Sequence, residues 1–214
     1  LVDEEILAKL PGSVVRVHST VVSTDHPVSL VEGIGAVLSS AVNLFMKSPH
    51  ILFIDAGFSS DKWVIMLACF MDGNHHIQPV GFELCSGESG SNWCLFLNML
   101  KEAGITEEGV PDLVIVSDQG KGLLAAVHDV FPFCEHVPCV THLERHFQDR
   151  WGKAHGVMYE DNTEAINIFN RMVEYYRRAC LAVTGEECGA WMLKARSLEI
   201  EYSSFHPVKE VHVD

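Results

Sequence analysis

Residues 111–132 read PDLVIVSDQGKGLLAAVHDVFP, and this stretch decides the fold class. An apolar run, Leu113–Val116, leads to Asp118, and a glycine-flanked lysine then opens an apolar segment with helical spacing. A strand followed directly by a helix is typical of α/β proteins, which present side chains where their strands end. The stretch therefore predicts a strand, a loop that carries a carboxylate, and a helix that stops before Pro132.

Three antiparallel strands and a helix are predicted before this stretch. Residues 50–58, HILFIDAGF, form an apolar run of strand length. Residues 62–84 are interpreted as two strands joined at Asp72 and Gly73, a dipeptide that strongly favours a hairpin turn. Residues 89–105 then show apolar side chains at helical spacing, closed by Gly104. These segments predict an antiparallel meander followed by a helix.

The remaining segments complete an α/β pattern. A short strand is expected over 135–142, a helix over 143–153, and helices throughout 160–197. Before the meander, we expect loosely packed structure over 1–30 and a helix over 29–48. This order of elements predicts a mixed sheet, three antiparallel strands followed by parallel strands, with flanking helices. It is also the order of the ribonuclease H-like fold.

The composition indicates a globular protein. Of the 214 residues, 48% are apolar and 21% charged, which suits one sizeable domain with or without a helical appendage. No apolar run reaches the ~18 residues that a membrane span needs. Seven cysteines scattered without a framework indicate reduced thiols in an intracellular protein. Because the chain starts at Leu1 with neither an initiator methionine nor a signal peptide, we expect a piece of something longer.

The net charge of −14 restricts the functions that fit the chain. Non-specific binding of nucleic acid depends on Lys and Arg side chains that release counterions from phosphates, and an acidic domain repels those phosphates. The charge can also reflect clustered carboxylates that bind metal ions. A DNA-related function therefore requires basic DNA-binding segments elsewhere.

Two segments resemble known catalytic or nucleotide-binding motifs but do not match them. Lys121 lies between glycines, yet a phosphate-binding loop requires Ser or Thr after the lysine, where this chain has Gly122. Residues 86–93, SGESGSNW, resemble the nucleophile elbow of serine hydrolases, but Ser91 stands where that motif needs its second glycine. Neither a nucleotide-binding loop nor a serine nucleophile is predicted.

Two aspartates stand at the ends of predicted strands. Asp55 closes ILFID and Asp118 closes VIVSD, each after an apolar run. If the strands are neighbours, the carboxylates meet at one edge of the sheet, where two like charges raise one pKa or bind a cation. Such oxygen ligands suit Mg²⁺ or Mn²⁺, which serve phosphoryl displacement. The alternative is that both carboxylates pair with backbone amides or lysines. For two such residues, we favour the metal site.

Residues 50–147 as a whole resemble the catalytic domain of Mutator-like (MULE) transposases, members of the DDE superfamily with a ribonuclease H-like core. The similarity rests on four segments in the family's order, which carry its first aspartate, an E-S-x-x-x-W-x-x-F-L signature, its second aspartate and a C-x-x-H. These segments are ILFIDAGF, MDGNHHIQPVGFELCSGESGSNWCLFLNML, VIVSDQGKGLLAAVHDVFP and CEHVPCVTHLERHF. The resemblance implies that Asp55 and Asp118 are the first two catalytic acids.

The family's third acid follows a helical insertion, near a T-S-N-x-x-E-x-x-N motif. Here Trp191, Tyr202 and Glu210 have suitable order and spacing, although FHP stands in place of the T-S-N. The resemblance implies that Glu210 is the third catalytic acid and metal ligand. The alternative is that Glu210 is an exposed tail charge, and Glu199 and Glu201 are weaker candidates.

Cys139 and His142 form the C-x-x-H. With His136 or His146 nearby they could bind a metal ion, but a lone C-x-x-H lacks the second ligand pair of a structural zinc site. We expect structural or orienting residues near the active site, and no zinc in this segment. Glu88, just before a predicted helix, is expected to cap that helix or to interact with its dipole.

The resemblance implies a metal-dependent transposase. Asp55, Asp118 and Glu210 would hold two Mg²⁺ or Mn²⁺ ions for DNA cleavage and strand transfer at transposon ends, with the DNA recognised through segments outside this chain. The alternatives are a catalytically inactive, domesticated scaffold or transcription-regulator module, and a ribonuclease H-like nuclease unrelated to transposition. No membrane partner is expected, and homo-oligomerisation is left open.

The expected organisation has three parts. Residues 1–45 form a partly helical flanking segment, 46–150 the catalytic core, and 151–214 a helical insertion with a return to the core. The expected location is intracellular, and nuclear if the source is a eukaryote.

Overall fold

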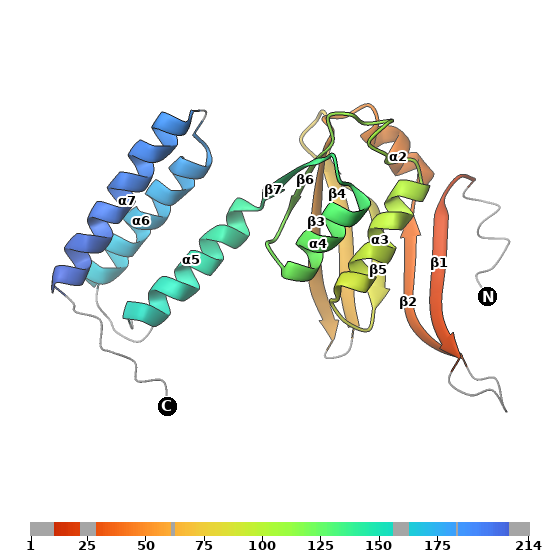
Figure 1. Ribbon diagram of the computed structural model, residues 1–214, viewed down its shortest axis with the longest axis horizontal. Coiled ribbons are helices and arrows are strands. Elements are labelled where there is room, and N and C mark those ends of the chain that lie inside the picture. The colour runs from red at the N-terminus through yellow and green to blue at the C-terminus, as the bar shows by residue number, and fades with distance from the viewer. Residues whose placement is uncertain (1–10, 22–28, 61–62, 156–162, 183, 206–214) are drawn as a thin grey trace. The chain divides into compact units, whose positions relative to one another are not determined.

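Figure 1 shows the computed structural model, which describes residues 11–21, 29–60, 63–155, 163–182 and 184–205. The chain divides into two compact units, Leu1–Pro138 and Cys139–Asp214. Within the described residues, the first unit contains seven strands and three helices, and the second contains three further helices. None of the helices in the described part of the chain is long and apolar enough to cross a membrane.

The first unit is built on one mixed sheet. Its strands are β1 (Val14–Val21), β2 (Ser29–Val37), β3 (Ile51–Ser60), β4 (Trp63–Met71), β5 (Ile77–Cys85), β6 (Val114–Ser117) and β7 (Glu135–Pro138). They lie in the order β1-β2-β5-β4-β3-β6-β7. The pairings β1–β2, β2–β5, β5–β4 and β4–β3 are antiparallel. Strand β6 runs parallel to β3, and β7 runs parallel to β6. The predicted α/β class and the mixture of antiparallel and parallel strands are confirmed.

The β4–β5 hairpin forms where the sequence predicts it. Asp72 Oδ1 accepts the backbone N–H groups of Asn74 and His76, at 2.9 Å each. These bonds, led by that from His76, hold the pKa of the Asp72 carboxyl below its usual value. His75 adopts a positive φ of 64°, a conformation that tight turns require. The aspartate side chain therefore closes the turn.

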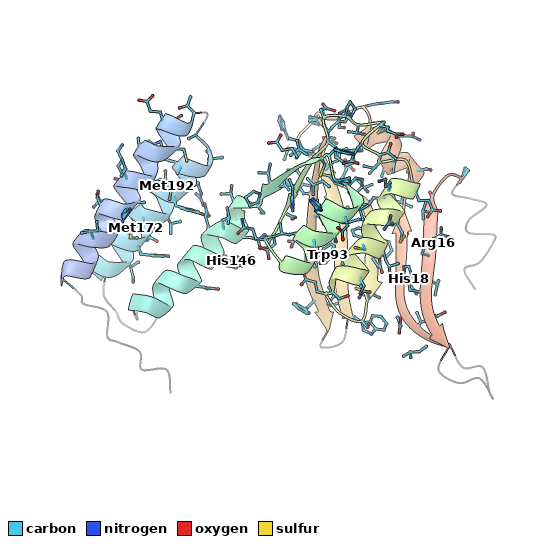
Figure 2. The ribbon with its side chains drawn as sticks, in the orientation of Figure 1. Arg16, His18, Trp93, His146, Met172 and Met192 are labelled. Atoms are coloured by element: carbon cyan, nitrogen blue, oxygen red, sulfur yellow. The ribbon has the colours of Figure 1, made fainter. Side chains whose placement is uncertain are left out.

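Helices cover one face of this sheet. Helices α3 (Gly90–Glu102) and α4 (Lys121–Val130) lie on the same face, and α2 (Ser39–Phe45) packs near its end (Figure 1). The core lies between sheet and helices, and Trp93 of α3 is buried in it (Figure 2). Strand residues alternate between the two faces. The other face consequently carries exposed apolar side chains, among them Ile34, Phe53, Ile65, Leu67 and Phe82.

The predicted helix over 29–48 is wrong for its first half. Residues 29–37 form β2, and the helix α2 begins only at Ser39. A Cβ on Gly35 would lie 2.8 Å from Met99 Cε, and one on Gly33 would lie 3.1 Å from the Leu84 carbonyl oxygen. The two glycines, which weaken a helix, thus allow the backbone of β2 to lie close to β5 and α3. The segment expected to be loosely packed also contains a regular strand, β1.

The second unit is helical, as predicted. Helices α5 (Val140–His155), α6 (Thr163–Cys180) and α7 (Gly185–Phe205) follow one another along the chain. Met172 of α6 and Leu198 of α7 are buried together, and Figure 2 labels Met172 and Met192 on these two helices. Arg177 of α6 donates two hydrogen bonds to Glu144 of α5, at 2.6 and 2.9 Å. This ion pair joins α6 to α5.

Candidate active site

The two predicted aspartates follow paired residues of neighbouring strands. Strands β3 and β6 run parallel, and their register pairs Ile54 with Ser117. Asp55 and Asp118 each come one residue later in the chain. Both aspartates therefore lie at the level of the sheet where β6 ends and α4 is about to begin.

Asp55 and Asp118 are each more exposed than the residue before them. Ile54 and Ser117 are buried on the helix-covered face, at 2% and 1% exposure. Because successive strand residues point to opposite faces, Asp55 belongs to the uncovered face, and Asp118 is the first residue after β6. Asp55 is exposed and Asp118 is half-buried, so solvent reaches both residues. Both carboxylates are therefore accessible from solvent.

The Asp118 loop is held by a hydrogen-bonded network that sequence reasoning missed. Asp118 Oδ1 accepts the Gln119 N–H at 2.6 Å, and Ser117 Oγ donates to the Asp118 carbonyl at 2.8 Å. Ser117 Oγ also lies 2.7 Å from His136 Nε2, on β7. Because the hydroxyl proton is already used, His136 must donate through Nε2. Burial lowers the pKa of His136 and so favours this neutral ring.

The Ser117–His136 pair had a weak sequence signal. His136 had been considered as a metal ligand near Cys139, and its Nε2 instead bonds to Ser117. Serine is a common polar residue, and its position before Asp118 does not by itself indicate a partner. Only the pairing of β6 with β7 shows that Ser117 contacts His136. The network positions the backbone from which Asp118 extends.

The first turns of α3 and α4 meet beside the Asp118 loop. A Cβ on Gly122 would lie 3.0 Å from the Gly90 backbone nitrogen, so the two helices touch through their backbones. Glu88 Oε1 accepts the indole N–H of Trp93 at 3.3 Å and lies 3.9 Å from the place that a Cβ on Gly120 would occupy. The N-cap bond itself comes from Ser89, whose Oγ accepts the Asn92 N–H. Glu88 is therefore near the helix start, as expected, but bonds to a side chain and does not cap the helix.

A shallow hollow lies beside Asp55. It measures about 310 Å³ and is lined by Asp55, Ala56, Gly57, Phe58, Ile65 and Leu67. Phe58 is 80% exposed at its rim. An accessible carboxylate beside exposed apolar and aromatic surface can contact a ligand that has both a charged and an apolar part.

The third acid is not described by the structure. Glu210 lies outside the described residues, and so do the side chains of Glu199 and Glu201. Within the part of the chain that is described, no group of three or more His, Cys, Asp or Glu side chains could hold a metal ion. Asp55 and Asp118 carry carboxylate oxygens of the kind that Mg²⁺ and Mn²⁺ prefer, and their role as metal ligands stays a prediction.

Cys139 and His142 stand at the start of the second unit. Cys139 directly precedes α5, and its carbonyl accepts the N–H of Leu143. His142 lies in the first turn of that helix, and both residues are half-buried. Their orienting role near the aspartates stays a prediction.

Many α/β proteins with different functions carry acidic residues at the ends of adjacent strands, so the fold alone defines only a broad class. Within it, a family model described as Transposase, Mutator family, matches residues 45–188, which is more than half of the chain. The chain therefore belongs to the Mutator family of transposases, and the resemblance inferred from the sequence is confirmed.

A bacterial relative supports this assignment. The chain is 33% identical over 92 residues to the transposase for insertion sequence element ISRM5 of Rhizobium meliloti (strain 1021). The matched segment covers 43% of this chain and 22% of the relative, so the similarity spans about a fifth of the relative's length. Because the relative is bacterial, the nuclear location expected for a eukaryotic source is not supported.

Proposed function

We propose that this chain is the catalytic part of a transposase that cleaves DNA and transfers strands with the help of a divalent metal ion. The observation that carries the proposal is the placement of Asp55 and Asp118. Their strands are parallel neighbours in register, and both residues are accessible from solvent. Membership of the Mutator family suggests both the metal ion and DNA as the partner.

The proposed roles follow from the chemistry of the side chains. Asp55 and Asp118 would hold Mg²⁺ or Mn²⁺ through their carboxylate oxygens, and Glu210 is proposed as the third acid. A bound divalent ion supplies electrostatic stabilisation of charge on the phosphate oxygens. The Ser117–His136 hydrogen bond and the Gln119 N–H keep the Asp118 loop in place. The chain's own contribution is thus to pre-position the acids.

The finer fold assignment and the division into parts belong to the same proposal. The order β5-β4-β3-β6-β7, three antiparallel strands followed by two parallel ones, supports a ribonuclease H-like core. We propose the core over 46–150, with the helical insertion over 151–214 and Cys139 and His142 as orienting residues between them. An inactive, domesticated scaffold is not favoured, because the chain belongs to the Mutator family of transposases and keeps two accessible acids after its strands β3 and β6 begin to pair.

A calorimetric titration with Mn²⁺ tests the proposal. The unmodified chain should bind the ion, and Asp118→Asn should weaken binding at least tenfold, because a neutral amide replaces a charged ligand (about 1.4 kcal/mol or more). Asp112→Asn is the matched control, since Asp112 lies at the other end of β6 and contacts His50. It should bind Mn²⁺ as the unmodified chain does.

The activity of the same variants completes the test. On a DNA substrate carrying the element's ends, Asp55→Asn and Asp118→Asn should each lower the cleavage rate by about 100-fold or more, the order of magnitude for removing one group that stabilises transition-state charge. Equal Mn²⁺ binding by the unmodified chain and Asp118→Asn would overturn the assignment of Asp118. Ion binding without cleavage by the complete protein would support the scaffold instead.

A further inference from the structure

A cluster of cations and aromatic rings lies on the α6–α7 pair. Lys194 Nζ stands 3.9 Å from the centre of the Trp191 ring, and Arg178 Cζ stands 4.9 Å from it. The ring of Tyr175 is 5.7 Å from that of Trp191. Cations placed over an aromatic ring are held by the negative face of its π-system. The Trp191 ring therefore fixes the position of two positive charges.

Helical spacing adds a third cation. Arg171, Tyr175 and Arg178 are four and three residues apart, so they share one side of α6. Trp191 and Lys194 are likewise three residues apart on α7. Arg171, Arg178 and Lys194 are exposed. We refer to these five residues, Arg171, Tyr175, Arg178, Trp191 and Lys194, as the Trp191 face.

The Trp191 face departs from the charge of the chain as a whole. The sequence has 15 Lys and Arg residues against 29 Asp and Glu residues. On this face, the described acids are Glu174, which bonds to Arg178 at 2.7 Å, and Glu187, one turn before Trp191. Three cations grouped around two aromatic rings are therefore a local exception in an acidic protein.

We propose that the Trp191 face binds the phosphate backbone of duplex DNA without sequence preference. The choice of DNA rests on the proposed function. The face provides exposed charges for phosphates, and its ring is already engaged by Lys194 and Arg178, which favours contact with phosphates over stacking on bases. This assigns a DNA contact to the chain itself, whereas the sequence had placed DNA recognition in segments outside it.

Fluorescence anisotropy with a short labelled duplex of arbitrary sequence tests the proposal, with EDTA present to remove divalent ions. With three phosphate contacts, the logarithm of the binding constant should fall with the logarithm of salt concentration with a slope of about −2.7. Lys194→Gln and Arg171→Gln should each make the slope shallower by about 0.9 and weaken binding. Arg196→Gln is the matched control, because two residues along a helix face different ways and Arg196 lines an apolar groove with Met172 and Tyr176.

Glu174→Gln separates a phosphate contact from a merely structural role. This variant removes an acid and frees Arg178, so it should bind the duplex more tightly than the unmodified chain. A damaged fold would give the opposite result. Absence of salt-dependent binding, equal losses in Lys194→Gln and Arg196→Gln, or a clear preference for single-stranded DNA would overturn the proposal.

Duplex binding by the Trp191 face and Mn²⁺ binding at Asp118 can be tested independently. Asp118→Asn should bind the duplex normally in EDTA while losing Mn²⁺. One combination of results would exclude the Trp191 face alone: Asp118→Asn loses Mn²⁺ binding, and the unmodified chain does not bind the duplex. The assignment of Asp118 to the metal site would then still stand.

Discussion

Two pairs of strands in the same sheet place carboxylates in opposite surroundings. Beside the β3–β6 pair, Asp55 and Asp118 lie within reach of solvent. Beside the β2–β5 pair, Glu83 lies on the helix-covered face with 1% exposure. Burial raises the pKa of Glu83 to about 7. A carboxylate near the open surface therefore stays accessible to a ligand, whereas the charged form of one buried under the helices destabilises the folded state.

The buried carboxylate is reached by a histidine from two strands away. His18 Nε2, on β1, lies 3.6 Å from Glu83 Oε1, on β5, across the intervening β2. Gly33 of β2 leaves the space, because a Cβ there would stand 3.3 Å from Glu83 Oε1. Within the described residues, His18 Nε2 and Glu83 Oε2 have no hydrogen-bond partner. Figure 2 labels His18 on β1, which precedes the residues matched by the family model.

The largest loss of stability is expected from a substitution at Gly81, where β5 packs against β2. A Cβ at this position would lie 2.8 Å from the Ala36 carbonyl oxygen, so Gly81→Ala must push β2 away from β5. We expect a loss of about 2–3 kcal/mol in the free energy of unfolding, as for other overpacked sites. Gly57→Ala, on β3, is the control, because nothing lies within 4 Å of a Cβ there. Urea denaturation measures both, and equal stabilities would contradict the tight β2–β5 contact.

An effect of similar size, but confined to higher pH, should follow from the ionisation of Glu83, which Glu83→Gln removes. The folded pKa of about 7 exceeds the ordinary value of 4.5, so the folded state holds a proton that the unfolded state releases between these pH values. Stability is therefore greatest below about pH 4.5 and falls as the pH rises to about 7, by up to about 3 kcal/mol. Glu83→Gln should remove this fall.

Urea midpoints measured across this pH range check the prediction. The variant and the unmodified chain should differ little at pH 5, where Glu83 is mostly protonated when folded, and the variant should be the more stable at pH 8. Parallel curves for the two proteins would show that the Glu83 carboxylate ionises without cost in the folded state.

The smallest effect is expected at the outer surface of β1. Arg16 donates to both carboxylate oxygens of Glu102 on α3, at 2.6 and 2.7 Å, and both side chains are about half exposed. Solvent screens such a pair, so Arg16→Ala should lower the free energy of unfolding by about 0.5 kcal/mol. The difference should vanish in concentrated salt. A loss comparable to that of Gly81→Ala would show that β1 depends on this ion pair.

The strands that carry the aspartates could be predicted because their signals are local. Apolar runs ending at Asp55 and Asp118, and the Asp72-Gly73 turn, mark strands and a hairpin without reference to distant residues. Strand β2 could not be found in this way. Its glycines and apolar spacing indicate a weak helix, and only pairing with β5 makes it a strand.

Burial in β5 escapes sequence reasoning for a similar reason. Alternation would bury Phe82 and expose Glu83, yet Phe82 is 44% exposed and Glu83 is buried. The helices cover the face to which Glu83 points, and the sequence of β5 alone does not say which face that is. The Ser117–His136 contact likewise depends on the pairing of β6 with β7. What sequence patterns miss here is set by neighbours far along the chain.

The contact between Gly90 and Gly122 has a consequence for motion. With backbone against backbone, there is no side chain between the first turns of α3 and α4 that could change rotamer and let one helix slide past the other. The two helices are therefore expected to move as one body. Asp118 lies between this joint and the end of β6, so both ends of its loop are attached to packed elements.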